Sequence, residues 1–171
     1  MPHVLIAADA DWVINDVCSA LEGPETTFTI CRTGQSVTAA ASAETPDLAV
    51  LDLQIANMGG MAVCMTLRQD ESGGRLPHIK VLMLLDRMAD LFLARRAGAE
   101  GWLVKPLDSL RLRRAATTIL AGGTVYEGLP PDAGSDEPGE SDEPAESDEP
   151  AETDGPDHGT ESARGDAMPA Q

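Results

Sequence analysis

Short apolar runs alternate with longer, partly polar segments along the first 120 residues. The runs predict buried strands, because four to eight consecutive apolar residues are typical of a parallel strand that is covered on both faces. They lie at residues 4–8, 28–31, 47–53, 80–85 and 101–104. The segments between and after them predict helices at residues 11–21, 35–43, 61–68, 88–97 and 109–120. Strands that alternate with helices predict an α/β fold, a doubly wound five-stranded parallel sheet, commonly in the order 2-1-3-4-5.

An aspartate stands near the end of the central run, at Asp52. A charge inside a buried strand is costly unless it emerges at the strand's carboxyl end, which is where open α/β sheets bind ligands. In the expected strand order, Asp9 and Asp52 end neighbouring strands, and Lys105 ends the strand two further over. We therefore expect these three side chains to converge at one edge of the sheet.

The net charge of −17 is concentrated in the last part of the chain. From Glu127 onward there are 15 acidic residues and one basic residue, whereas the first 126 residues hold 14 acidic and 11 basic residues. The sequence Ser-Asp-Glu-Pro recurs every six residues from Ser135, with no apolar face to bury. This SDEPxE composition predicts a disordered acidic low-complexity tail at residues 127–171, after a domain at residues 1–126.

Composition also excludes several classes of protein. The nearly neutral domain lacks the basic patch of a nucleic-acid reader. The cysteines, at Cys18, Cys31 and Cys64, have neither CxxC nor zinc-ligand spacing, so we expect buried thiols in a reducing cytosol. There is no signal-peptide pattern and no apolar run long enough to span a bilayer. We expect a soluble, cytoplasmic protein.

Two carboxylates beside a lysine suit a hard cation together with a phosphoryl group. Mg²⁺ prefers oxygen ligands, and a lysine ammonium is a compact partner for phosphate. An aspartate at such a site can act as the nucleophile and carry the phosphoryl group.

Residues 4–120 resemble the CheY-like receiver domain of two-component response regulators. Five features carry the resemblance, in order: Asp9 after the first strand, Asp52 after the third, Met58-Gly59-Gly60 in the following loop, Trp102 in the fifth strand, and Lys105-Pro106 after it. The resemblance implies a flavodoxin-like fold and a role in phosphorelay signal transduction. It identifies the chain as an atypical stand-alone member.

The resemblance also implies roles for individual residues. Asp52 would be the phosphoacceptor, supplied by a histidine kinase or a phosphotransfer protein. Asp9, Asp52 and the backbone carbonyl of Gln54 would bind Mg²⁺. Lys105 would contact the phosphoryl group, and its bond to Pro106 would be cis.

Two positions depart from the family pattern. Ala8 stands where the family has a second acid, so Mg²⁺ binding would be weaker. Leu85 stands where the family has Ser or Thr, so the hydroxyl that links phosphorylation to the switch aromatic, here Trp102, is missing. Asp86 or Asp11 could compensate for the missing acid, but Asp86 could equally repel a phosphoryl donor.

Other interpretations stay open at this stage. Asp9 could be only a helix N-cap, Lys105 a solvated lysine, and Trp102 a core or partner-contacting residue. The chain could be a pseudo-receiver, a protein-interaction module that works without phosphate. A small flavodoxin-like enzyme is disfavoured because the first strand is not followed by a glycine-rich loop, and we expect no enzyme.

The expected output surface is the face formed by the last two helices and the fifth strand. Five arginines lie on those helices: Arg95, Arg96, Arg111, Arg113 and Arg114. We expect an effector protein to bind there, and the acidic tail to screen the arginines or to serve only as a solubilising brush. The tail has too few apolar residues for a helix-turn-helix, so we expect no direct DNA binding.

Overall fold

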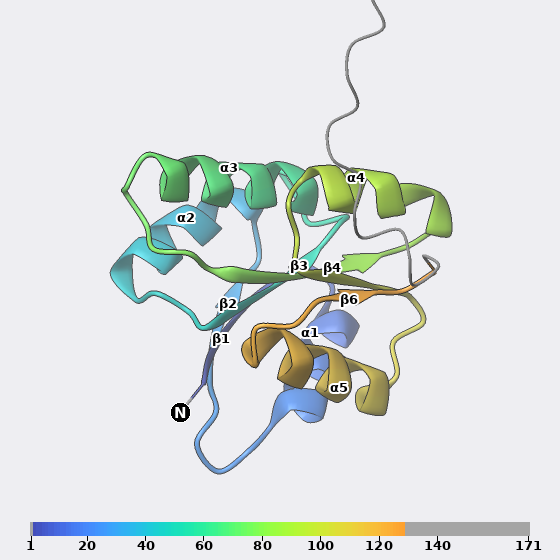
Figure 1. Ribbon diagram of the computed structural model, residues 1–171. Helices are drawn as coiled ribbons and strands as arrows, with labels where there is room; N and C mark the ends of the chain where they lie inside the picture. Colours follow the sequence, from blue (N-terminus) through green and yellow to red (C-terminus); the bar gives the residue numbers. More distant parts are fainter. Residues whose placement is uncertain (1, 129–171) are drawn as a thin grey trace, which may run out of the picture. The chain divides into compact units, whose positions relative to one another are not determined.

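Figure 1 shows a computed structural model of the chain, which describes residues 2–128. The sheet strands are β1 (His3–Ala7), β2 (Thr27–Cys31), β3 (Leu48–Asp52), β4 (Lys80–Leu85), β5 (Gly101–Val104) and β6 (Val125–Tyr126). The helices are α1 (Asp11–Leu21), α2 (Gly34–Ala43), α3 (Gly60–Ser72), the 3-10 turn η1 (Met88–Asp90), α4 (Leu91–Arg96) and α5 (Ser109–Leu120). All strand pairs are parallel, in the order β2-β1-β3-β4-β5-β6.

Helices cover both faces of the sheet. Figure 1 shows α2, α3 and α4 on one face and α1 and α5 on the other. Alternate side chains of a strand point to opposite faces, so β1 serves both layers. Leu5 and Ala7 pack under α2 and α3, whereas Val4 and Ile6 pack against α1 and α5. The doubly wound α/β fold predicted from the sequence is confirmed, and so is the order of its first five strands.

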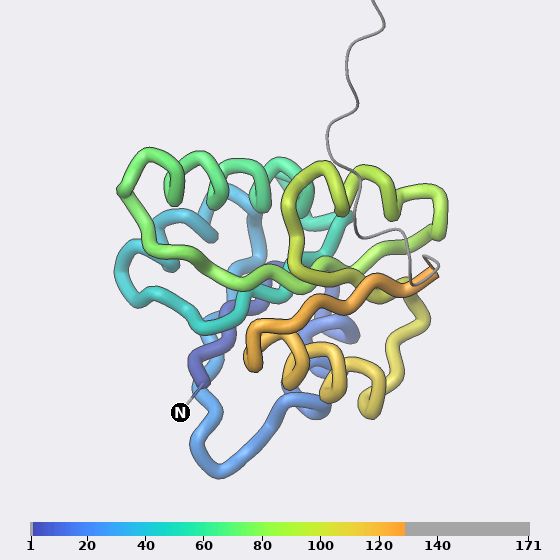
Figure 2. The backbone as a smooth tube through the Cα atoms, in the orientation of Figure 1, coloured from blue at the N-terminus to red at the C-terminus, as the bar shows by residue number. Residues whose placement is uncertain are grey.

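The sixth strand was not predicted. After α5 the chain turns at Gly122, whose φ of +89° lies in the left-handed region that favours glycine. Val125 and Tyr126 then align with Gly101 and Trp102 on the outer edge of β5. Figure 2 shows this orange segment running beside the sheet after the chain leaves α5. Two residues are too few to show any periodicity in the sequence.

The starts of two helices bear on the site. The N-cap of α1 is Ala10 and makes no side-chain capping bond, so the interpretation of Asp9 as the N-cap is wrong. The N-cap of α5 is Asp108, whose side chain accepts a hydrogen bond from the backbone N–H of Arg111 at 2.9 Å. Asp9 is thus not used by the helix and remains available at the sheet edge.

The start of α3 fixes the position of Asp52. A Cβ on Gly60 would overlap the backbone carbonyl oxygen of Asp52, so only glycine lets the helix begin this close to β3. The backbone N–H of Gly60 also donates to the carbonyl of Leu53 at 3.1 Å. Close packing of backbone on backbone therefore holds the end of β3 rigidly.

None of the helices within residues 2–128 is long and apolar enough to pass through a lipid bilayer. The expected tail, apart from Glu127 and Gly128, lies outside the described residues.

Candidate functional site

Asp52 and Lys105 form a buried ion pair at the carboxyl end of the sheet. Lys105 Nζ lies 2.7 Å from Asp52 Oδ1, and the exposed fractions of the two side chains are 10% and 2%. The backbone N–H of Gln54 donates to the same oxygen at 3.2 Å. Because a buried charge needs a partner, each of these groups stabilises the other. The interpretation of Lys105 as a solvated lysine is wrong.

Lys105 contacts two further groups. Its ammonium donates to Asp86 Oδ1 at 3.1 Å, just beyond the end of β4. It also lies 5.5 Å from the centre of the Trp12 ring, on the first turn of α1, in a cation–π arrangement. The Lys105 ammonium therefore contacts groups from three parts of the fold: Asp52 in β3, Asp86 just after β4, and Trp12 in α1.

Asp9 follows β1 at the same edge of the sheet as Asp52 and is exposed to solvent. The strand β1 pairs directly with β3. Arg32, the residue after β2, donates to the backbone carbonyl of Asp9 at 3.2 Å and to the carboxylate of Asp11 at 2.6 Å. The sequence analysis missed Arg32, although the rule that locates Asp9 and Asp52 at the ends of strands also applies to it.

The ligands that the resemblance implies for Mg²⁺, the carboxylates of Asp9 and Asp52 and the backbone carbonyl of Gln54, would all offer oxygen, which is the atom that this ion prefers. Neither of the two acids that could compensate for Ala8 completes the set of Mg²⁺ ligands, because Asp11 pairs with Arg32 and Asp86 pairs with Lys105. Among residues 2–128, no three His, Cys, Asp or Glu side chains gather closely enough to hold a metal ion by themselves.

The two atypical positions are both buried. Ala8 is 1% exposed and Leu85 is inaccessible to solvent. The Leu85 side chain joins the core under α3 and α4, and its carbonyl accepts from the backbone N–H of Lys105 at 2.8 Å. Neither side chain can bind an ion or donate a hydrogen bond, so this site has fewer polar contacts than the family pattern implies.

Trp102 is fully buried in β5. Its indole N–H donates to the backbone carbonyl of Glu127 at 2.9 Å, and its ring stacks on Tyr126 with centroids 4.4 Å apart. In this structure, Trp102 is a core residue covered by the segment that follows α5. The bond between Lys105 and Pro106 is cis.

The family model described as the response regulator receiver domain matches residues 4–117. The chain belongs to this family. Receiver domains are modules of two-component signalling, and the matched residues include Asp9, Asp52, Asp86 and Lys105.

Curated relatives include response regulators of several bacteria. The receiver is 29% identical to the transcriptional regulatory protein CseB of Streptomyces coelicolor over 145 residues, which cover 80% of this chain and 58% of CseB. It is 25% identical to protein PilH of Pseudomonas aeruginosa over 122 residues, covering 71% of this chain and all of PilH. The chain spans about half the length of the transcriptional regulators that it matches.

Solved structures share the fold of this receiver. The chemotaxis response regulator CheY4 of Vibrio cholerae superposes with a TM-score of 0.61 at 22% identity, over 68% of this chain and 97% of CheY4. The receiver domain of the Francisella response regulator 1452 gives 0.62 at 18% identity, over 71% and 98%.

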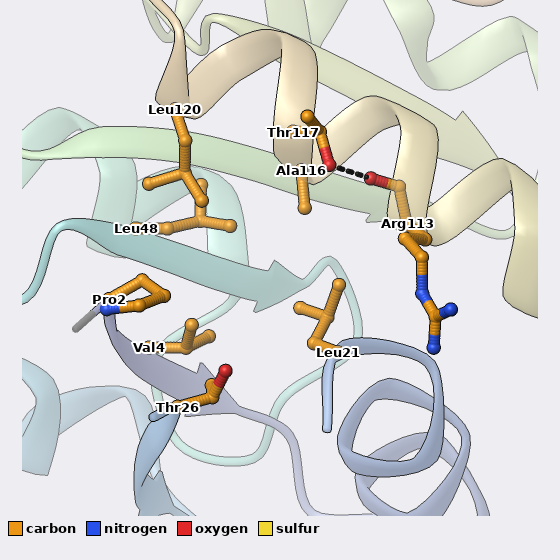
Figure 3. Close-up of a pocket in the computed structure, with 9 residues that line it drawn as sticks. All are labelled: Pro2, Val4, Leu21, Thr26, Leu48, Arg113, Ala116, Thr117 and Leu120. Atoms are coloured by element: carbon orange, nitrogen blue, oxygen red, sulfur yellow. Dashed lines mark hydrogen bonds between the residues drawn. The ribbon is translucent and has the colours of Figure 1, made fainter. Parts of the chain in front are cut away.

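A small cavity of about 220 Å³ lies away from the acidic site, between α1, α5 and the amino ends of β1 and β3 (Figure 3). Its lining is mostly apolar, with Val4, Leu48 and Leu120 facing one another. The Arg113 side chain at its rim donates to the carbonyl of Ala20 at 2.9 Å and so ties α5 to α1. We assign this cavity no part in the acidic site of the receiver.

Among the five arginines expected to meet the acidic tail, Arg113 is bonded to the carbonyl of Ala20 in the domain. Arg111 forms an ion pair with Glu127, the first residue of the predicted tail. The remainder of the tail lies outside the described residues, so screening of the arginines by the tail stays a prediction.

Proposed function

We propose that this receiver accepts a phosphoryl group on Asp52 from a histidine kinase or a phosphotransfer protein, and passes the signal to a protein partner. The supporting observation is the 2.7 Å contact between Lys105 Nζ and Asp52 Oδ1 at the carboxyl end of β3. It places a cation beside the carboxylate that would become an acyl phosphate.

The reaction is a displacement at phosphorus. An oxygen of the Asp52 carboxylate forms a bond to phosphorus as the bond between phosphorus and the donor's imidazole nitrogen breaks, and that nitrogen keeps the electron pair. Within the described residues, the hydrogen bonds to this carboxylate converge on Oδ1, so Oδ2 is available to attack. Lys105 then neutralises part of the negative charge on the bound phosphoryl group.

Asp9, Asp52 and the Gln54 carbonyl would hold Mg²⁺. When bound, this ion would offset charge on the phosphoryl oxygens as they approach two carboxylates. Because Ala8 removes one carboxylate, we propose that this receiver needs more Mg²⁺ than a receiver with two adjacent acids.

We further propose that the chain acts in the cytoplasm as a signalling module rather than as an enzyme, with residues 1–126 as receiver and 127–171 as acidic tail. The partner would bind the face of α4, β5 and α5, where Phe92 is 68% exposed. We propose no direct contact with DNA.

The test is phosphorylation by a small donor. The full chain would be incubated with Mg²⁺ and acetyl phosphate and then weighed by mass spectrometry. We expect a gain of one phosphoryl group that is lost in Asp52→Asn and when Mg²⁺ is chelated. Asp16→Asn, an exposed acid on α1, makes the same charge change away from the site and should leave the gain intact. Absence of any gain with the small donor and with a cognate kinase would contradict the proposal.

The second candidate is a pseudo-receiver, favoured by the burial of Ala8 and Leu85. In that case a partner would bind the unphosphorylated chain. Its affinity would be the same for Asp52→Asn as for the natural sequence, and acetyl phosphate would not change it.

A further inference from the structure

The segment after α5 closes over the edge of β5. We call residues 124–128 the strap. Its strand β6 adds to β5 in parallel, and the backbone N–H of Val125 donates to the carbonyl of Glu100 at 3.1 Å. At its far end, Gly128 has φ of +83° and lies so close to Met88 that a Cβ would overlap that side chain. The strap therefore runs across the outer edge of the sheet from the end of α5 to η1, the turn before α4.

Glu127 fixes the strap by three contacts. Its backbone carbonyl accepts from the Trp102 indole at 2.9 Å, and its carboxylate accepts from the backbone N–H of Val104 at 2.7 Å. The same carboxylate forms an ion pair with Arg111. The N–H of Val104 would normally face a further strand, so the Glu127 side chain satisfies an edge donor that two residues of β6 are too short to reach.

Arg111 connects this contact to the acidic site. Besides Glu127, its guanidinium donates to the carbonyl of Val104 at 3.3 Å and to the carbonyl of Pro106 at 3.2 Å. These two carbonyls flank Lys105, whose ammonium is bonded to Asp52. A path of hydrogen bonds and covalent bonds therefore runs from the Asp52 carboxylate, through the side chain of Lys105 and the backbone on both sides of it, to Arg111 and the strap.

We propose that Arg111 is a positioning residue that couples the strap to the charge on Asp52, so that phosphorylation of Asp52 releases the strap from β5. This inference rests on the proposed function. In the family pattern, a hydroxyl at the position of Leu85 links phosphorylation to the rest of the domain. Leu85 has no hydroxyl, and the proposal assigns this link to Arg111 and Glu127.

The charges around Lys105 explain why phosphorylation would release the strap and not tighten it. Lys105 now divides its ammonium between Asp52 and Asp86, at 2.7 and 3.1 Å. A phosphoryl group on Asp52 adds negative charge and draws the ammonium away from Asp86, which shifts the backbone between Val104 and Pro106. The guanidinium of Arg111 is rigid and planar, so it cannot follow both carbonyls and also keep Glu127. The contact with Glu127 is then lost, and the edge of β5 becomes free for a partner.

Hydrogen exchange in the full chain tests this coupling. The indole proton of Trp102 reports directly on the strap, because its acceptor is Glu127. The same indole proton in the chain without acetyl phosphate serves as the reference. With Mg²⁺ and excess acetyl phosphate, exchange at the Trp102 indole should rise about tenfold, whereas Asp52→Asn should show no rise. In the covalent step, Asp52 forms the bond to phosphorus and acetate leaves with the electron pair of the bond that breaks.

Two variants distinguish coupling between Asp52 and the strap from a purely structural role of Arg111 and Glu127. Arg111→Lys keeps the charge but loses the planar fork, so it should be phosphorylated normally while the tenfold rise falls below twofold. Glu127→Gln should raise exchange even without phosphate. Because coupling is reciprocal, Glu127→Gln should also bind beryllofluoride, an inert phosphoryl analogue, several-fold more tightly. Glu25→Gln, at an exposed residue before β2, is the control and should behave as the natural sequence.

The outcomes distinguish the two proposals. A phosphoryl mass gain without a change in Trp102 exchange would overturn the coupling and leave the proposed function intact. No mass gain would overturn both. If Arg111→Lys changed basal exchange but kept the tenfold rise, Arg111 would be a structural contact only, and the coupling would be overturned.

Discussion

The Asp86 carboxylate lies 3.1 Å from the Lys105 ammonium, so Asp52 shares this cation with a second acid. Asp86 is half-exposed, whereas Asp52 is buried. The ammonium is therefore held between an inner carboxylate that can receive a phosphoryl group and an outer one that competes for the charge needed to stabilise it.

Replacement of Asp86 should make the site more reactive. Asp86→Asn removes the competing charge and a source of repulsion toward an anionic donor. We expect phosphorylation by acetyl phosphate to become two- to fivefold faster, equivalent to about 0.5–1 kcal/mol for one half-exposed charge. The gain should shrink in high salt, because screening weakens exposed charges. Asp16→Asn on α1 should give no gain; equal acceleration by both variants would point to net charge alone.

Leu85→Thr should restore a missing contact at the expense of stability. The exchange of a buried leucine for a smaller, polar side chain should lower the free energy of unfolding by about 2–3 kcal/mol. A hydroxyl at this strand end should also slow loss of the phosphoryl group from Asp52, measured by the decay of the added mass. Leu84→Thr is the matched control because Leu84 packs against α1 and α5 on the other face. It should be destabilised similarly without any change in phosphoryl lifetime.

The buried thiol of Cys64 should make stability fall at high pH. Burial raises the pKa of Cys64 to about 11, from 9.0. The unfolded chain therefore loses this proton first as the pH rises. The corresponding stability is fully present below about pH 9 and is lost progressively up to about pH 11, by about 2–3 kcal/mol. Urea unfolding between pH 8 and 11 should show a loss of stability that is larger in the natural chain than in Cys64→Ala.

Differences in burial should also make the three cysteine thiols differ in reactivity. Burial also raises the pKa values of Cys18 and Cys31, but Cys18 is only partly buried. We expect iodoacetamide to modify Cys18 first in the folded chain, and Cys64 only after unfolding. Modification of Cys64 at the same rate as Cys18 in native conditions would contradict this assignment.

Glu100 should be important for stability at the opposite end of β5. Both of its carboxylate oxygens lie 2.7 Å from Arg68, and one accepts from the backbone N–H of Val81 at 2.6 Å. Glu100→Ala leaves the backbone N–H of Val81 without this acceptor and removes the carboxylate paired with Arg68, which keeps its bonds to Gly98, Ile79 and Glu71. The variant should lower the free energy of unfolding by about 2–4 kcal/mol. Glu71→Ala removes a 3.2 Å contact with Arg68 and a 2.7 Å contact with the half-exposed His78, and it should cost under about 1 kcal/mol. Urea unfolding of the two variants would measure both losses.

The strands could be predicted from the sequence because a strand that is buried on both faces consists of an unbroken run of apolar residues. In β3, five residues are all buried, so the run is unbroken until Asp52. Once the strands are ordered in parallel, their carboxyl ends share one edge, which is why the proximity of Asp52 and Lys105 could be inferred without coordinates. The helix predicted at residues 11–21 also has its predicted bounds in α1, although its start lies at the turn at Ala10 and not at a capping side chain.

Contacts made by exposed or very short segments could not be predicted. Trp12 contacts Lys105 because of the direction of its side chain, which the spacing of apolar residues does not encode. Asp86 was expected near the site, but only the geometry shows that its partner is Lys105. Glu127 stands at the head of an acidic run, and nothing in the composition marks it as a residue bonded to Val104 and Arg111.

The two-residue strand β6 has a consequence for association between molecules. An uncovered strand edge offers unpaired N–H and C=O groups on which another chain can build, and very short edge strands are one way in which proteins avoid aggregation. In this domain β6 and the Glu127 carboxylate cover the open side of β5. A crystallographer who shortens this chain to improve its behaviour should therefore cut after Gly128, since a cut at the end of α5 would expose β5 and favour edge-to-edge oligomers.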